Sequence, residues 1–201
     1  VPSAGALLVT GGARGVTAHC LSYLLSQSPR PVVIVGRTEL TQPSWAAKAS
    51  TNEQLFAAAS QAGITSPKEL RLAVERINAQ RELQRTLEGL RALSSCPVLY
   101  WPADVTDVDA LRRVVEQAEA ELGPITSLIH AAGVIDDKKI IDKRYQSFER
   151  VVATKVNGLE FLLELLGRRK TAPLEEVCVF SSVAAWSGNP GQSDYSFANQ
   201  T

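Results

Sequence analysis

Short apolar runs alternate along the chain with longer stretches in which apolar residues recur every three or four positions. The apolar runs predict strands at residues 6–10, 32–35, 98–101, 127–130 and 177–180. The helical spacing predicts helices at about residues 16–26, 109–121 and 148–167. Strands that alternate with helices favour a parallel sheet with right-handed crossovers. We therefore predict an α/β fold, a Rossmann-like doubly wound parallel sheet flanked by helices.

The segment between the second and third predicted strands is longer than one crossover needs. Two capping-box patterns, at residues 50–53 and 66–69, predict a short helix over about 51–61 and a long helix over about 67–93. A single crossover helix takes a dozen or so residues, so about 30 residues are surplus here. We predict that residues 41–76 form a helical insertion within one domain that spans residues 1–201.

Composition and charge narrow the function classes. The chain has 201 residues with 45% hydrophobic and 21% charged side chains, and its formal net charge is +0. With no basic excess, binding to nucleic acid or to an acidic membrane has no electrostatic support. No apolar run approaches the ~20 residues of a membrane span, and no signal peptide is visible. Neither nucleic acid nor a membrane is therefore an expected partner.

The cysteines and the chain ends give two further expectations. Cys20, Cys96 and Cys178 are odd in number and far apart, so they predict no metal site and no redox pair, and they favour a reducing cytoplasm. The chain contains no methionine and has no helix-stop signal at residues 199–201. The simplest interpretation is a piece of a longer polypeptide, truncated at its C-terminal end, and a processed free-standing protein is the alternative.

A glycine-rich turn joins the first predicted strand to the first predicted helix. Glycines at such a turn let the backbone approach a pyrophosphate at the helix N-terminus. The alternative is a tight turn that merely needs glycine, and the spacing departs from G-x-G-x-x-G because Thr17 stands where the last glycine would be. The candidate cofactor-binding residues of this turn are Thr10, Gly11, Gly12, Arg14, Gly15 and Val16.

The end of the second predicted strand bears on the choice of cofactor. Gly36 and Arg37 stand there, where an acidic residue would bind the ribose 2′-hydroxyl of NAD and an arginine suits the 2′-phosphate of NADP. Arg14 could bring a second positive charge to the same phosphate. The alternative is a pair of solvated surface arginines, but two converging arginines favour NADPH over NADH.

Two further strand ends carry candidate cofactor contacts. Asp104, followed by Val105, comes just after the third strand and could accept a hydrogen bond from adenine, or it could be a helix cap or turn residue. After the fourth strand, small residues would let the cofactor lie against the backbone; these are Ala131, Ala132 and Gly133. His130, beside them, is expected to be a packed residue at the strand end.

The last predicted strand is followed by a serine and a tyrosine that could carry chemistry. Ser182 lies thirteen positions before Tyr195, and Asn199 follows Tyr195 by four, so the last two share one helical face. The loop between Ser182 and Tyr195 could fold the tyrosine back over the strand end. Lys155 lies in the preceding helix. Each residue also has a purely structural interpretation. The serine could cap a helix, the tyrosine could be a core residue, and the lysine could be a solvated charge on its helix.

These motifs resemble the short-chain dehydrogenase/reductase superfamily, and more narrowly the ketoreductase domains of type I polyketide and polyunsaturated fatty acid synthases. The resemblance is carried by TGGARGVT, VGR, ADVTD, HAAGVIDD, TKVNGL and FSSVAAWSGNPGQSDYSFAN. The superfamily at large has Lys four residues after Tyr, whereas synthase ketoreductases place Asn there and take Lys from the preceding helix. Asn199 and Lys155 match that exchange. The insertion is most similar to the polyunsaturated fatty acid synthase type.

The resemblance implies NADPH-dependent reduction of a β-ketoacyl thioester to a β-hydroxyacyl thioester. The expected partners are an acyl carrier protein that bears the substrate and the other domains of the same synthase. Tyr195 would be the general acid, and Lys155 would favour its ionised form and hold the cofactor ribose. Ser182 would hydrogen-bond the ketone oxygen, and Asn199 would fix Lys155 or a relay water.

The resemblance also implies a stereochemical outcome. Asp136 and Asp137 follow Ile135 where B-type ketoreductases carry Leu-Asp-Asp, and the alternative is a solvated acidic pair. A-type enzymes place Trp eight residues before the tyrosine, whereas Trp186 stands nine before it. We therefore expect the D (3R) alcohol. Two other hypotheses stay open: a non-catalytic structural Rossmann subdomain of a synthase, and a free-standing reductase of another ketone.

Overall fold

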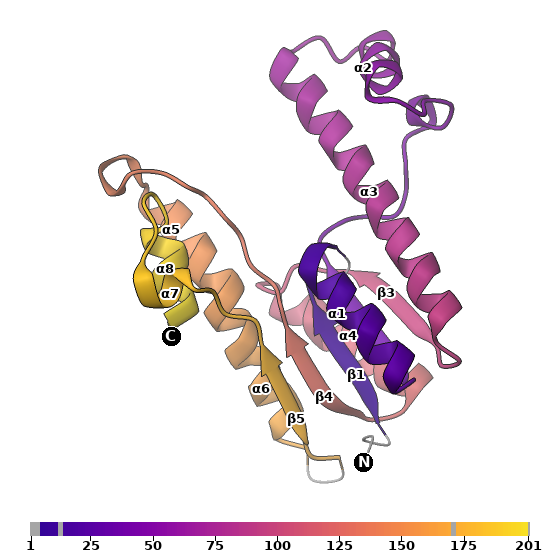
Figure 1. Ribbon diagram of the computed structural model, residues 1–201, viewed down its shortest axis with the longest axis vertical. Helices are drawn as coiled ribbons and strands as arrows, with labels where there is room; N and C mark the ends of the chain where they lie inside the picture. The colour runs from indigo at the N-terminus through magenta and orange to yellow at the C-terminus, as the bar shows by residue number, and fades with distance from the viewer. Residues whose placement is uncertain (1–4, 12–13, 170–171, 201) are drawn as a thin grey trace.

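Five parallel strands form one sheet in the order β3-β2-β1-β4-β5 (Figure 1). The computed structural model describes residues 5–11, 14–169 and 172–200. The strands are β1 (Ala6–Thr10), β2 (Val32–Gly36), β3 (Val98–Pro102), β4 (Ile125–His130) and β5 (Glu176–Val179). The strand order reverses between β1 and β4, so a ligand crevice is expected beyond their carboxyl ends.

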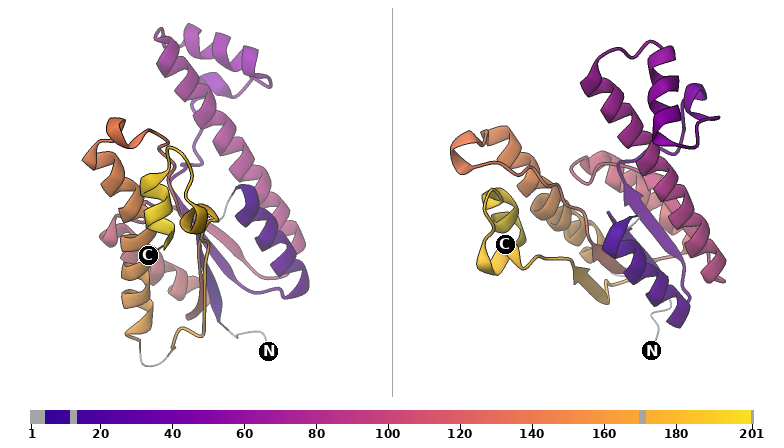
Figure 2. Two further views of the ribbon diagram at one scale, coloured as in Figure 1. Left: turned by 60° about the vertical axis from the view of Figure 1, so that its left-hand side comes forward. Right: turned by 45° about the horizontal axis from the view of Figure 1, so that its top comes forward.

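Helices cover both faces of the sheet (Figure 2). On one face lie α1 (Gly15–Gln27) and the C-terminal half of α3 (Pro67–Leu93), and on the other lie α4 (Val108–Leu122) and α6 (Gly158–Gly167). Side chains alternate between the faces along each strand. In β1, Leu7 and Val9 therefore join the α1 and α3 core, whereas Leu8 joins the α4 and α6 core.

The edge strand β5 differs from the four others. All four of its residues are exposed, whereas β1 is buried throughout. Beyond β5 the chain forms two short helices, α7 (Ala184–Ser187) and α8 (Ser193–Gln200). Helix α8 packs against α7 and against α5 (Tyr145–Val152), so the chain after the sheet returns over the carboxyl end of β5.

The helix expected at residues 148–167 is interrupted. It begins earlier, with α5, continues through a π-helical turn at Ala153–Asn157 and ends with α6. A π-turn adds one residue to a helical turn and is common at functional sites. The apolar spacing gave no sign of it, because the flanking helical faces stay apolar on either side.

The two expected capping boxes are both corrected. The box at the start of α2 (Asn52–Gln61) is formed by Thr51 and Gln54, one position later than expected, because Thr51 has the extended cap conformation. At the start of α3 the Ser66 side chain makes no capping hydrogen bond, although Pro67 is at the first helical position as expected.

The insertion has a small core of its own. A single turn at Ser44–Ala46, helix α2 and the N-terminal half of α3 bury Ala46, Ala49, Leu55, Val74 and Ile77. The C-terminal half of the same α3 contributes Leu83, Leu87 and Leu90 to the sheet core. Gln80 lies between the two cores and donates from Nε2 to the Thr41 carbonyl at 3.0 Å. One continuous helix therefore fixes the insertion to the sheet.

Candidate active site

The glycine turn sits against the end of β4. Gly11 has a positive φ of 69°, and a Cβ there would lie 2.8 Å from the Ala131 carbonyl oxygen and the Ala132 nitrogen. Only glycine fits this close approach. Gly15, at φ 60°, has open space where a Cβ would be, which a phosphate can approach. Gly12 lies outside the described residues.

Hydrogen bonds join the ends of β1 and β4 beneath this turn. Thr10 Oγ1 is 2.9 Å from His130 Nδ1 and accepts from the Ala132 nitrogen at 3.3 Å. His130 is fully buried, in agreement with its expected packing role. Burial, and secondly the charge of Lys155, lower the pKa of His130 to about 4. The ring is therefore neutral at pH 7.

A cavity of about 1240 Å³ opens at this edge of the sheet. It brings together the predicted cofactor-binding residues Gly11, Arg14, Gly36, Arg37, Asp104, Val105, Ala131, Ala132 and Gly133. The predicted residues that lie outside its lining are Thr10, Gly15, Val16, Lys155 and Tyr195. Of these, Thr10 is fully buried and Val16 is 72% exposed at the start of α1. Gly11 lets the backbone of the turn lie close to a ligand, and the arginines of the cavity wall can bind phosphate. These two features fit a dinucleotide.

Asp104 is the turn residue that one of the two sequence interpretations expected. Its Oδ1 accepts from the Thr106 nitrogen at 2.9 Å and the Thr106 hydroxyl at 2.8 Å. Its Oδ2 lies 3.9 Å from Arg37 Nη1. The sequence has no acidic residue at the end of β2, but Asp104, just after the end of the neighbouring strand β3, lies close to Arg37. Both side chains are well exposed, so this ion pair is weak.

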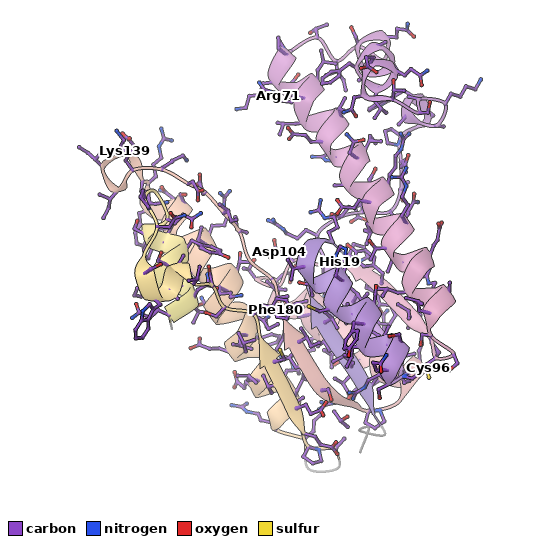
Figure 3. All side chains as sticks on the ribbon, in the orientation of Figure 1. His19, Arg71, Cys96, Asp104, Lys139 and Phe180 are labelled. Carbon is purple, nitrogen blue, oxygen red and sulfur yellow. The ribbon has the colours of Figure 1, made fainter. Side chains whose placement is uncertain are left out.

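Lys155 lies in the π-turn and reaches the carboxyl end of β5. It is 8% exposed, and its Nζ donates to the carbonyl oxygen of Phe180, the labelled residue at that strand end in Figure 3. Burial lowers the pKa of Lys155. The lysine is therefore a buried group at the end of β5 and not a solvated helix charge.

Ser182, Tyr195 and Asn199 follow the same strand end. Ser182 Oγ accepts from the Ala184 nitrogen at 3.2 Å, a local turn contact just before α7, whose N-cap residue is Val183. Asn199 Nδ2 donates to the Tyr195 carbonyl at 2.8 Å, one helical turn back. Its Oδ1 is buried without a hydrogen bond. Ser181 holds α8 in place by donating from Oγ to the Asn199 carbonyl at 2.8 Å.

The two acidic residues after β4 are engaged in contacts. Asp136 pairs with Lys138 at 3.0 Å and Arg150 at 3.2 Å, and it also accepts from the Ser147 hydroxyl. The Ser147 hydrogen bond, followed by that of Lys138, lowers the pKa of Asp136. Asp137 accepts from Gln192 Nε2 at 3.0 Å. Asp136 and Asp137 therefore stabilise the loop in which they lie. Asp137 also connects this loop to the loop before Tyr195.

Sequence reasoning missed a buried ion pair next to Tyr195. Lys143 Nζ lies 2.7 Å from Asp194 Oδ2, with side-chain exposures of 6% and 1%. Asp194 is adjacent to Tyr195 in sequence, which is the one signal available. No spacing rule links it to Lys143, which lies 51 positions earlier. Trp186, by contrast, is 94% exposed, so its side chain faces solvent.

The family model for the KR domain matches residues 5–201. The chain belongs to the KR, or ketoreductase, domain family. A polyunsaturated fatty acid synthase of Thraustochytrium sp. is 34% identical over 208 residues, which cover 96% of this chain and 7% of that protein. Polyketide synthase PksM of Bacillus subtilis is 36% identical over 119 residues, covering 59% of this chain and 3% of that protein. The chain thus spans a small part of these relatives.

Solved structures confirm the predicted fold. An N-terminal ketoreductase from the macrolactin assembly line superposes with a TM-score of 0.70 at 29% identity, covering 99% of this chain and 32% of that one. Carveol dehydrogenase from Mycobacterium avium, in complex with NAD, superposes with a TM-score of 0.67 at 16% identity, covering 99% of this chain and 62% of that one, which shows the shared fold alone. The ketoreductase resemblance is confirmed, and the family is one of oxidoreductases whose fold implies a nicotinamide cofactor.

Two features are absent from the described residues. No helix among them combines the length and the apolar character that crossing a bilayer requires. No group of His, Cys, Asp and Glu in the same part of the chain is arranged to hold a metal ion.

Proposed function

We propose that this ketoreductase domain reduces a β-ketoacyl thioester to the β-hydroxyacyl thioester with NADPH. The substrate would be borne by an acyl carrier protein of a cytoplasmic multidomain synthase, in which residues 1–201 form a domain and 41–76 its insertion. The observation that carries the proposal is the contact of Lys155 Nζ with the Phe180 carbonyl. This contact places the lysine at the end of β5, shortly before Ser182. The hydrogen bond between Ser181 and Asn199 holds α8 near the same strand end.

NADPH, when bound, supplies the hydride to the ketone carbon. Negative charge then develops on the ketone oxygen, which must receive a proton. The Ser182 oxygen accepts from the Ala184 N–H, so its own hydroxyl proton is free to point at that oxygen. Tyr195 donates the proton that completes the alcohol.

Lys155 is proposed to stabilise the tyrosinate left by that transfer and to return a proton to it. Its ammonium favours the ionised form of a neighbouring phenol. Because burial lowers the pKa of Lys155, the lysine gives up a proton more readily than a solvated one. The buried, unbonded Oδ1 of Asn199 is an acceptor for Lys155 or for a relay water.

The preference for NADPH rests on Arg14 and Arg37, which line the cavity together. Arg37 keeps only a weak pairing with Asp104, so a 2′-phosphate can compete for its guanidinium. The D (3R) outcome rests on Asp136 and Asp137, whose loop is bound to the loop before Tyr195. Chiral analysis of the product tests this second part separately.

The decisive experiment follows NADPH oxidation with acetoacetyl-CoA, using protein expressed from the complete reading frame. We compare wild type, Tyr195→Phe and the control Tyr23→Phe, whose tyrosine is exposed on α1. Loss of the general acid should reduce turnover by about 10²-fold or more with NADPH binding retained. Tyr23→Phe should behave as wild type. A folded wild type with neither NADPH binding nor turnover would replace this proposal with the structural-subdomain hypothesis.

A further inference from the structure

The cofactor cavity extends beyond the residues that the fold itself supplies. One side is formed by the ends of β1, β2 and β4. The other side is formed by the helical insertion, through Thr41, Trp45, Ile64, Leu72 and Arg76. Figure 1 shows α2 and the upper half of α3 standing above this edge of the sheet. The insertion therefore borders the cleft as well as filling the connection between two strands.

The insertion is held rigidly enough to act as a wall. Three hydrogen bonds fasten the strand-to-insertion segment to α3: Gln80 to the Thr41 carbonyl at 3.0 Å, Gln42 to Gln84 at 3.2 Å, and Arg81 to the Ala46 carbonyl at 2.9 Å. At the other end of that segment, the Tyr100 hydroxyl donates to the Thr38 carbonyl at 2.7 Å and lies 3.0 Å from the Gly36 carbonyl. The segment after β2 is thus pinned between β3 and α3.

The cavity wall carries arginines that are available to an anion. Arg14, Arg37 and Arg76 all line it. Across the described residues, neither Arg14 nor Arg76 takes part in an ion pair, and Arg37 has only the distant Asp104. Glu39, Glu75 and Asp104 also line the cavity, so its formal charges balance and an anion would bind through the guanidinium groups that have no close partner. Arginine is the side chain best suited to phosphate, because its planar fork matches two phosphate oxygens.

We propose that the insertion completes the binding site for the 2′-phosphorylated adenosine half of the cofactor. Arg76 supplies an additional guanidinium for the 2′-phosphate, and Trp45 with Leu72 forms an apolar wall for the adenosine. This inference rests on the proposed use of NADPH. It assigns to residues of the insertion a ligand contact that the strand ends alone do not provide.

Binding of adenosine 2′,5′-bisphosphate tests the role of Arg76 without requiring turnover. Arg76→Gln is compared with Arg71→Gln, which removes an exposed arginine of the same helix outside the cavity lining (labelled in Figure 3). We expect Arg76→Gln to weaken the bisphosphate by about fivefold at low salt, the upper range for a solvent-facing pair, and to leave 5′-AMP unchanged. The difference should shrink as salt is raised.

Intrinsic fluorescence gives a second readout for the wall. The bisphosphate should change the emission of the wild type, Trp45→Phe should abolish that change, and Trp186→Phe should keep it. If Arg76→Gln and Arg71→Gln bind alike while wild type binds NADPH, the insertion has no part in the site and the proposed function stands. If wild type binds neither the bisphosphate nor NADPH, both proposals fail.

Discussion

Lys143 and Asp194 form an ion pair from which water is almost wholly excluded, with Nζ and Oδ2 2.7 Å apart. Each partner is also bound to the backbone of a functional segment. Lys143 Nζ donates to the Asp136 carbonyl at 2.7 Å, and Asp194 Oδ1 accepts from the Tyr195 nitrogen at 2.8 Å. The pair therefore connects the acidic loop after β4 to the start of the helix that carries Tyr195.

Breaking this pair should destabilise the protein strongly. Lys143→Met leaves the Asp194 carboxylate buried without its counter-charge, and such changes cost about 3–5 kcal/mol. Urea unfolding of the variant should show this loss. The double variant Lys143→Met with Asp194→Asn should be less destabilised than Lys143→Met alone, since no uncompensated charge remains. The exposed pair Arg168 and Glu164 is the control, and Glu164→Gln should change stability by no more than about 0.5 kcal/mol.

His130 should make stability depend on pH below neutrality. Its pKa falls from 6.5 to about 4 on folding, so between these values the unfolded chain binds more protons and stability rises with pH. The stabilisation is complete above about pH 6.5 and is lost as the pH falls toward 4, with a total on the order of 3 kcal/mol. Unfolding free energies across this range should rise less steeply for His130→Asn. An unchanged slope would contradict the assignment, and His19→Asn, at an exposed site, serves as the control.

Two glycines with opposite surroundings should respond oppositely to alanine. At Gly11 a Cβ would collide with the backbone of Ala131 and Ala132, and φ is positive, so Gly11→Ala should lower stability and abolish dinucleotide binding. At Gly89, inside α3, a Cβ meets nothing within 4 Å, so Gly89→Ala should raise stability by about 0.5–1 kcal/mol. Thermal unfolding and NADPH titration measure both, and equal effects would refute the close approach.

The contact between Asp137 and Gln192 should matter for product stereochemistry. Asp137→Ala removes the acceptor that joins the two loops, so we expect a lower proportion of the D alcohol with little change in the melting temperature. Chiral chromatography of the reduced thioester gives the ratio. Asp142→Ala, in the same loop, is the matched control. Unchanged stereoselectivity in Asp137→Ala would remove this contact from stereocontrol.

The regular elements could be predicted from the sequence because each satisfies a local rule. The strand centres fall on apolar runs, and the long helix has the expected ends at Pro67 and Leu93, since proline favours its first turn and the apolar stripe ends at Leu90. The glycine turn and Arg37 were placed correctly at the sheet edge for the same reason: carboxyl ends of parallel strands meet there.

The remaining features depend on long-range contacts. The π-turn at Lys155 leaves the apolar pattern of its helix intact, so periodicity does not reveal it. The Lys143 and Asp194 pair, the loop contact of Asp137 and the approach of Asp104 to Arg37 each join distant segments. The hydrogen bond of Asn199 Nδ2 within its own helix is local, because the Tyr195 carbonyl is one turn away.

The hydrogen bond from Gln80 to the Thr41 carbonyl has a consequence for how this fold could be re-engineered. It places Thr41, where the chain leaves the sheet, next to Gln80, where the chain comes back to it. The segment between them is therefore a loop with adjacent ends. Closing a loop between adjacent points costs little, and that cost grows only slowly with loop length. A short linker between these two points could therefore replace the segment while the sheet keeps its register. The segment could likewise be grafted onto a ketoreductase that lacks it.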